Sequence, residues 1–182
     1  LCFVRVPRPG PIGFISQSGT FGMYLAEIAV EKGYGLSKFI SIGNQADLNA
    51  ADYLEYLMED DDTKAIVLYM EGFHEGRRFF KVAREAVSRK PVLIYKSGRT
   101  AVGARAARSH TASLAGEDKV FDALCRQTGM IRADEVTQPF DMAEALAHLP
   151  LPRGNRVAIL GSGGQGVVTA DACTLLGLDV PE

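Results

Sequence analysis

The sequence contains a histidine between two hydroxyl residues, in the run Ser109, His110 and Thr111. A neutral imidazole is a good nucleophile toward phosphoryl groups near pH 7. Such a histidine needs a partner that fixes its tautomer, and a carboxylate can do this by accepting the Nδ1 proton, which leaves Nε2 free to attack. Glu71 directly follows the strongly apolar run KAIVLYM and is the candidate partner.

A second stretch of small polar residues, Ser16-Gln17-Ser18-Gly19-Thr20, joins an expected strand to an expected helix. Backbone N–H groups and hydroxyls at a helix N-terminus favour an anion, because the helix dipole is positive there. A glycine at this point allows close backbone approach or a positive φ. The residues alone leave two interpretations open, a phosphate cradle or a helix that is merely capped by Ser18 or Thr20.

The stretch from Ala86 to Gly116 has no acidic residue. Its basic residues are Arg89, Lys90, Lys96, Arg99, Arg105 and Arg108. Residues 96–116 are predicted to form a long loop, and loops of such length in compact domains are usually functional or disordered. A basic loop fits a phosphate-bearing ligand, and the alternative is a solvated basic surface.

Apolar runs of strand length alternate with segments of helical period along most of the chain. The expected strands are residues 11–16, 37–42, 64–70, 91–95 and 130–133, and the expected helices are residues 20–32, 50–59, 75–88, 117–128 and 138–148. This alternation predicts an α/β fold, a three-layer parallel sheet with helices on both faces, and five strands favour the flavodoxin-like order 2-1-3-4-5. Ligands in such sheets lie at the carboxyl ends of the strands.

The prolines of LPLPRG interrupt this alternation and indicate a linker. We expect the tail of a preceding domain or a linker over residues 1–10, a flavodoxin-like domain over 11–149, a linker over 150–154 and the first β-α unit of a truncated second α/β domain over 155–182. One β-α unit cannot bury its own core, so we expect the second domain to be incomplete here. The residues from Leu1 onward are expected to come from the interior of a longer polypeptide. The unit has a glycine-rich candidate loop with Gly161, Gly163, Gly164 and Gly166.

Composition argues against several classes of protein. Lys plus Arg number 20 and Asp plus Glu number 22, and the resulting net charge of −2 gives no support to nucleic-acid or anionic-membrane binding. No apolar run approaches the ~20 residues of a membrane helix. Cys2, Cys125 and Cys173 are widely spaced, so neither a disulfide framework nor a metal site is indicated. We expect a cytoplasmic protein with no metal in this chain and no nucleic-acid or membrane partner.

The stretches GFISQSGTFG, IVLYMEG, KPVLIYKSGR and ARSHTASLAG occur in this order. Together they resemble the nucleoside-diphosphate-forming acyl-CoA synthetase family, the relatives of succinyl-CoA synthetase. The resemblance covers nearly the whole chain and corresponds to the middle, flavodoxin-like domain of the α part, followed from Asn155 by the start of the next domain. SHTASLAG is its most specific stretch, and Ala112 stands where the family often has glycine.

The resemblance implies that His110 is transiently phosphorylated and that the Glu71 carboxylate hydrogen-bonds it. The phosphate contacts expected on this basis are Ser16, Ser18, Gly19, Thr20, Ser109 and Thr111. In the implied reaction, acyl-CoA and phosphate give acyl phosphate and CoA, the histidine takes the phosphoryl group, and ADP then receives it. This chain alone is expected to bind only phosphate and to be inactive.

The remaining parts of the enzyme are also implied by the resemblance. A CoA-binding domain should precede the chain, and an ATP-grasp domain or subunit should bind ADP or ATP with Mg. The acyl-CoA or carboxylic acid substrate and the oligomeric state stay open.

Two other functions also stay open on the sequence. Some protein acetyltransferases carry a related module as a non-catalytic CoA or acyl-CoA sensor, although the histidine motif is typically lost there. Gly161, Gly163 and Gly166 match the dinucleotide-binding pattern G-x-G-x-x-G between an expected strand and an expected helix, which is the alternative of an oxidoreductase fragment. The acid that supports such a motif would fall about 20 residues further on, after Glu182.

Overall fold

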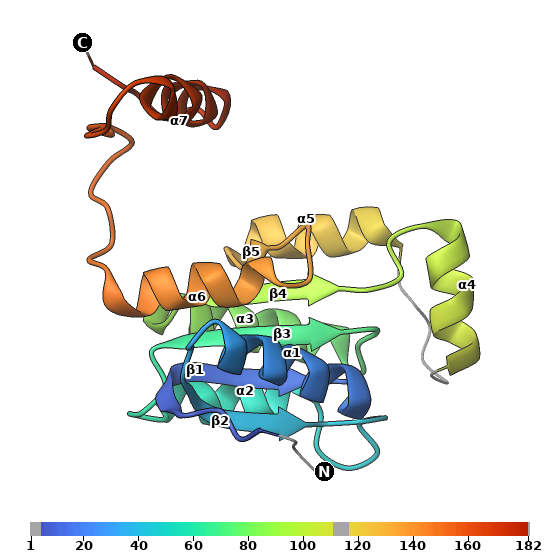
Figure 1. Ribbon diagram of the computed structural model, residues 1–182. Helices are drawn as coiled ribbons and strands as arrows, with labels where there is room; N and C mark the ends of the chain where they lie inside the picture. Colours follow the sequence, from blue (N-terminus) through green and yellow to red (C-terminus); the bar gives the residue numbers. More distant parts are fainter. Residues whose placement is uncertain (1–4, 111–116, 182) are drawn as a thin grey trace. The chain divides into compact units, whose positions relative to one another are not determined.

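The computed structural model describes residues 5–110 and 117–181, and only the backbone of residues 107–110. The chain divides into two units, Leu1–Leu149 and Pro150–Glu182. The strands of the first unit are β1 (Pro9–Ser16), β2 (Leu36–Ser41), β3 (Ala65–Met70), β4 (Val92–Lys96) and β5 (Ile131–Arg132) (Figure 1). Its helices are α1 (Gly19–Glu31), α2 (Ala50–Glu59), α3 (Gly76–Arg89), α4 (Ala101–His110), α5 (Asp118–Thr128) and α6 (Gln138–His148).

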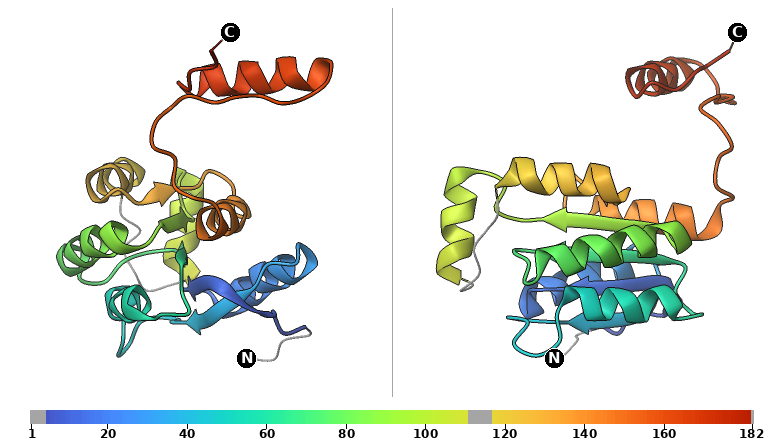
Figure 2. Two further views of the ribbon diagram at one scale, coloured as in Figure 1. Left: turned by 90° about the vertical axis from the view of Figure 1, so that its left-hand side faces the viewer. Right: turned by 180° about the vertical axis from the view of Figure 1, so that it is seen from behind.

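The strands form one parallel sheet of order β2-β1-β3-β4-β5. Helices α1 and α6 cover one face of this sheet, and α2, α3 and α5 cover the other (Figure 2). The predicted flavodoxin-like fold with its strand order is therefore confirmed. No helix in residues 5–110 or 117–181 is long and apolar enough to cross a membrane.

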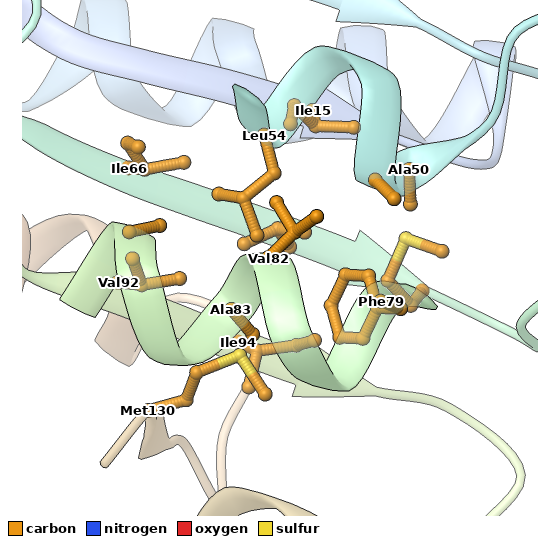
Figure 3. Close-up of a cluster of buried hydrophobic side chains, with 14 of the residues drawn as sticks. Ile15, Ala50, Leu54, Ile66, Phe79, Val82, Ala83, Val92, Ile94 and Met130 are labelled. Atoms are coloured by element: carbon orange, nitrogen blue, oxygen red, sulfur yellow. The ribbon is translucent and has the colours of Figure 1, made fainter. Parts of the chain in front are cut away.

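Strand β3 is buried along its whole length and divides the core into two layers. Ile66, Leu68 and Met70 join the cluster beneath α2, α3 and α5, which Figure 3 shows around Leu54, Phe79 and Val82. The intervening residues, Ala65, Val67 and Tyr69, join the cluster beneath α1 and α6. This split follows from the two-residue period of a strand, which sends successive side chains to opposite faces.

The predicted loop over residues 96–116 is wrong for Ala101–His110, which form helix α4. The segment AVGARAARSH is rich in alanine, the strongest helix former, and the Thr100 hydroxyl accepts the Gly103 N–H at 3.1 Å in its first turn. The segment carries few large apolar side chains at helical spacing, so the hydrophobic pattern that indicated the other helices is missing here.

The second unit contains helix α7 (Gly164–Leu175). The strand expected before the glycine-rich loop of this unit does not form, because the only pairing in the described part of this unit is one parallel bridge between Arg156 and Asp179. The Val157 N–H donates to the Asp179 carbonyl at 2.8 Å, and the Asp179 N–H donates to the Asn155 carbonyl at 2.9 Å. A strand needs a neighbouring strand for its backbone groups, and two hydrogen bonds do not make a ladder.

Two glycines allow β1 and β2 to approach closely where their pairing begins. A Cβ added to Gly35 would lie 2.6 Å from both the Gly10 Cα and the Pro9 carbonyl oxygen. We expect Gly35→Ala to lower the free energy of unfolding by about 1–3 kcal/mol, because backbone atoms must shift to admit the methyl group.

The matched control is Gly76→Ala at the start of α3, where an added Cβ meets nothing within 4 Å among the described residues. This change should be neutral or stabilise by up to ~1 kcal/mol. Urea unfolding followed by circular dichroism measures both variants, and equal unfolding midpoints would contradict the close approach.

Candidate functional site

A pocket of about 420 Å³ lies at the carboxyl ends of β1, β3 and β4. It is lined by Ser18, Phe21, Tyr69, Glu71, Ser97, Gly98, Gly103 and Ala106. The parallel register pairs Ser16 with Tyr69, and Met70 with Lys96, so the three strands end side by side. Helix α4 supplies the remaining wall through Gly103 and Ala106.

Gln17 links the loop after β1 to the end of β3. Its side chain is buried, and its Oε1 accepts the N–H groups of Glu71 at 2.8 Å and of Gly72 at 3.0 Å. The Gln17 N–H in turn donates to the Tyr69 carbonyl at 2.9 Å. These hydrogen bonds fix the backbone of Glu71 relative to the start of α1.

Glu71 is 9% exposed and lies in the pocket wall beside Tyr69. The Tyr69 hydroxyl lies 3.4 Å from Glu71 Oε1, within hydrogen-bond reach. Burial raises the pKa of Tyr69 to about 12, and the neighbouring Glu71 acts in the same direction, so this phenol stays a neutral donor at physiological pH. The Tyr69 ring packs on Phe21 at 4.8 Å and on Tyr95 at 6.1 Å between centroids.

The N-terminus of α1 forms the opposite side of the pocket. Ser18 is the N-cap residue, and its hydroxyl accepts the Phe21 N–H at 3.2 Å, so the capping role that the sequence allowed is present. The buried Ser16 hydroxyl donates to the Ser18 carbonyl at 2.7 Å. The first backbone hydrogen bond of α1 runs from the Gly22 N–H to the Ser18 carbonyl. The N–H groups of Gly19 and of the exposed Thr20 lie before this bond and are not part of the helical ladder. Those two amides are the groups at this helix end that an anion can use.

The expected catalytic histidine, His110, is the last residue of α4, the helix that forms a wall of the pocket. The side chains of Ser109 and His110, and the whole of Thr111, lie outside the described residues. The structure therefore gives the position of the helix that leads to this motif.

The basic residues between Ala86 and Gly116 do not gather at the pocket where they are described. Arg89 and Lys90 lie at the other end of β4, and Lys90 Nζ donates to the carbonyl oxygen of Asp60 at 2.6 Å. Lys96 is buried, which lowers its pKa, and its ammonium donates to the Ser97 carbonyl at 2.9 Å. The Arg99 guanidinium forms an ion pair at 3.0 Å with Asp134, which precedes α6. These bases therefore support the fold rather than line the pocket.

Sequence reasoning missed three contributors to the site, Gln17, Tyr69 and Ser97. Tyr69 precedes Glu71 by two residues, so the strand period already placed both on one side of β3. Ser97 follows β4 at the same sheet edge. Nothing in the sequence indicated that the Gln17 side chain turns toward the backbone of a strand 54 residues away.

The glycine-rich loop of the second unit begins α7. Gly163 is its N-cap residue with a φ of 60°, a left-handed value that favours glycine. Gly161 and Gly166 line a pocket of about 280 Å³ within this unit, and Gly164 is the first residue of the helix. Among the described residues of the chain, no three His, Cys, Asp or Glu side chains cluster as a metal site.

The fold and the pocket define a flavodoxin-like domain whose candidate site lies between a helix N-terminus and a buried carboxylate. The chain belongs to the family described as the succinyl-CoA ligase like flavodoxin domain, which matches residues 9–146.

Among its relatives is the alpha subunit of ADP-forming acetate–CoA ligase I of Pyrococcus furiosus, 47% identical over 171 residues, an alignment that covers 93% of this chain and 37% of the relative. The ADP-forming 4-hydroxybutyrate–CoA ligase of Nitrosopumilus maritimus is 40% identical over 176 residues, which is 94% of this chain and 25% of that protein.

A solved structure is also similar, the dinucleotide forming acetyl-coenzyme A synthetase 1 of Ca. Korarchaeum cryptofilum in complex with phosphate and ADP. It has a TM-score of 0.90 and 38% identity, and the match covers 96% of this chain and 38% of that one. The chain thus spans less than two fifths of these relatives.

The Gln17 hydrogen bonds generate a prediction about the pocket. Gln17→Leu keeps the side-chain volume but leaves two buried N–H groups without an acceptor, so we expect the free energy of unfolding to fall by about 2–5 kcal/mol. Amide hydrogen exchange of Glu71 and Gly72 should accelerate as well. Gln127→Leu on the exposed surface of α5 is the control, and unchanged exchange at Glu71 in the Gln17 variant would contradict the role assigned to Gln17.

Proposed function

We propose that this chain provides the phosphohistidine domain of an ADP-forming acyl-CoA synthetase, which catalyses acyl-CoA + ADP + phosphate ⇌ carboxylic acid + CoA + ATP. The observation that carries the proposal is the pocket in which the buried Glu71 carboxylate, the N-terminus of α1 and helix α4 meet. Helix α4 ends at His110, and the relatives are named as ADP-forming CoA ligases.

In this proposal His110 acts as the nucleophile and Glu71 holds the proton on its Nδ1. The Nε2 lone pair attacks the phosphorus of an acyl phosphate, the bond from phosphorus to the acyl oxygen breaks, and the carboxylate leaves. A terminal oxygen of ADP then attacks the phosphohistidine, which regenerates neutral His110 and gives ATP. Tyr69, which can donate a hydrogen bond to Glu71, helps to keep that carboxylate oriented.

The phosphoryl group needs donors that stabilise its charge while water is excluded. We assign this role to the amides of Gly19 and Thr20 together with Ser18, Ser109 and Thr111. Ser16 contributes by holding the Ser18 carbonyl, which shapes the turn that presents these amides. The partial positive charge at the start of α1 acts in the same direction.

The complete enzyme requires parts beyond this domain. We propose a CoA-binding domain and an ATP-grasp domain or subunit that binds ADP or ATP with Mg, all in the cytoplasm. The apolar side chains of α7 are largely exposed, Val167 at 64% and Leu175 at 88%, which supports the assignment of residues 155–182 to a larger second domain that covers them.

The first test of the proposal is labelling of His110. When the complete enzyme is incubated with radiolabelled ATP and Mg, it should become an acid-labile, base-stable phosphoprotein. His110→Ala should abolish both the label and turnover, whereas His74→Ala, in an exposed turn, should keep them. A labelled His110→Ala protein would overturn the assignment.

The second test concerns Glu71. Glu71→Gln should slow phosphorylation of the enzyme by more than about 10-fold, because orienting and basic groups typically contribute 10²–10⁴. Rapid-quench measurement of the label against time gives this rate. Glu75→Gln, which alters an exposed carboxylate that contacts Arg78 instead, is the matched control. Equal rates for the wild type and the Glu71 variant would remove Glu71 from the mechanism.

A further inference from the structure

A second concavity lies between α3 and α5. These two helices lie on the face of the sheet opposite α1 and α6 (Figure 2). This groove has a volume of about 850 Å³. Helix α3 contributes Arg77, Phe80, Lys81 and Arg84 to its lining. Helix α5 contributes Val120, Ala123, Leu124 and Gln127. None of these residues belongs to the pocket of the candidate site, so the groove needs a separate explanation.

The spacing of these residues makes each wall of the groove continuous. Arg77, Lys81 and Arg84 are separated by four and three residues, so they line up on one side of α3. Val120 and Leu124 lie four residues apart on α5. Each wall extends over about two helical turns, roughly 10 Å. The groove is therefore bordered by two rows of side chains, and helices pack into grooves between such rows.

The inner surface of the groove is apolar. Phe80 and Leu124 are half-buried between the two helices, and Val120 is 63% exposed although it is a large aliphatic residue. The Arg84 guanidinium lies over the Phe80 ring, 6.0 Å from its centroid. A partner that covers these side chains would remove their apolar surface from water, and this burial would stabilise the complex.

The wall of the groove on α3 carries positively charged side chains that form no ion pairs with the described residues. Arg78, which faces α2, pairs with Asp52 at 2.7 Å and with Glu55 at 2.9 Å. In the described part of the chain, by contrast, neither Arg77 nor Lys81 nor Arg84 has an ion pair. This concentration of cations stands out in a chain whose net charge is −2. Charge complementarity thus points to an acidic flank on whatever occupies the groove.

We propose that the groove docks an acidic amphipathic helix of a partner protein. The apolar side of that helix enters between α3 and α5 and covers Phe80, Val120 and Leu124. Carboxylates along one of its flanks pair with Arg77 and Lys81. Recognition of this kind uses apolar anchors at helical spacing for affinity and flanking charges for orientation. The inference does not depend on the proposed function, because it involves none of the residues assigned to phosphoryl transfer.

The test uses this chain, residues 1–182, and a synthetic helical peptide of about four turns, with leucines along one side and glutamates along one flank. Fluorescence anisotropy of the labelled peptide should give saturable binding that weakens as salt is added. Reversal of the three charges, Arg77→Glu with Lys81→Glu and Arg84→Glu, should weaken binding at least about tenfold, because exposed ion pairs each contribute a few-fold. Val120→Asp should weaken it similarly through the apolar side.

Two matched controls isolate the groove. Lys119→Glu removes an exposed cation of α5 that does not line the groove, and it should leave the affinity within about twofold. A peptide with lysines in place of the glutamates should bind at least about tenfold more weakly. All of these positions are exposed, so loss of folding is not expected and circular dichroism verifies it.

Several results would overturn the proposal. They are no saturable binding of the acidic peptide, equal binding to the charge-reversed variant, or equal binding of the lysine peptide. Self-association of the chain that Val120→Asp abolishes would assign the groove to a second copy instead. Binding of anionic vesicles through the same cations, without peptide binding, would assign it to a membrane surface.

Discussion

The parallel pairing of β1 with β3 is the constraint on which the candidate site depends. Its register runs from Ile12 opposite Ala65 to Ser16 opposite Tyr69, so the segments that follow the two strands emerge at one edge of the sheet. Gln17 then ties those segments together, because its buried side chain accepts two N–H groups at the end of β3. The start of α1 and the Glu71 carboxylate are thereby held on opposite sides of one pocket.

The same strand period that builds the core also places the carboxylate. Ala65, Val67 and Tyr69 face the layer beneath α1 and α6, and Glu71 continues that series just beyond the strand. Tyr69 and Glu71 therefore lie on the side of the sheet where Phe21 of α1 packs. The position of the Glu71 carboxylate thus follows from an ordinary packing rule, and its location past the end of β3 distinguishes it from a core residue.

Basic side chains in this protein have different roles that depend on what faces them. Lys90 and Lys96 are partly or fully buried and donate to backbone carbonyl oxygens, which compensates for their removal from water. Arg78 joins α3 to α2 through two carboxylates. Arg77, on the same helix but turned toward α5, has no carboxylate partner in the described residues. Two adjacent residues of α3 thus differ, because Arg78 stabilises the fold through its ion pairs and Arg77, on another side of the helix, is available to a partner.

The sequence by itself determined the order of the five strands, the helices of the first unit other than α4, and the flavodoxin-like sheet, because apolar period and segment length are local properties of the chain. It also determined that Ser16–Thr20 and Glu71 would lie at one sheet edge, since parallel strands end together. Helix α4 was missed, because an alanine-rich segment lacks the hydrophobic pattern that indicates a helix. Only the tertiary structure decided that Gln17 holds the end of β3 and that most of the basic stretch serves the fold. These facts depend on contacts between residues far apart in the chain, which no local pattern records.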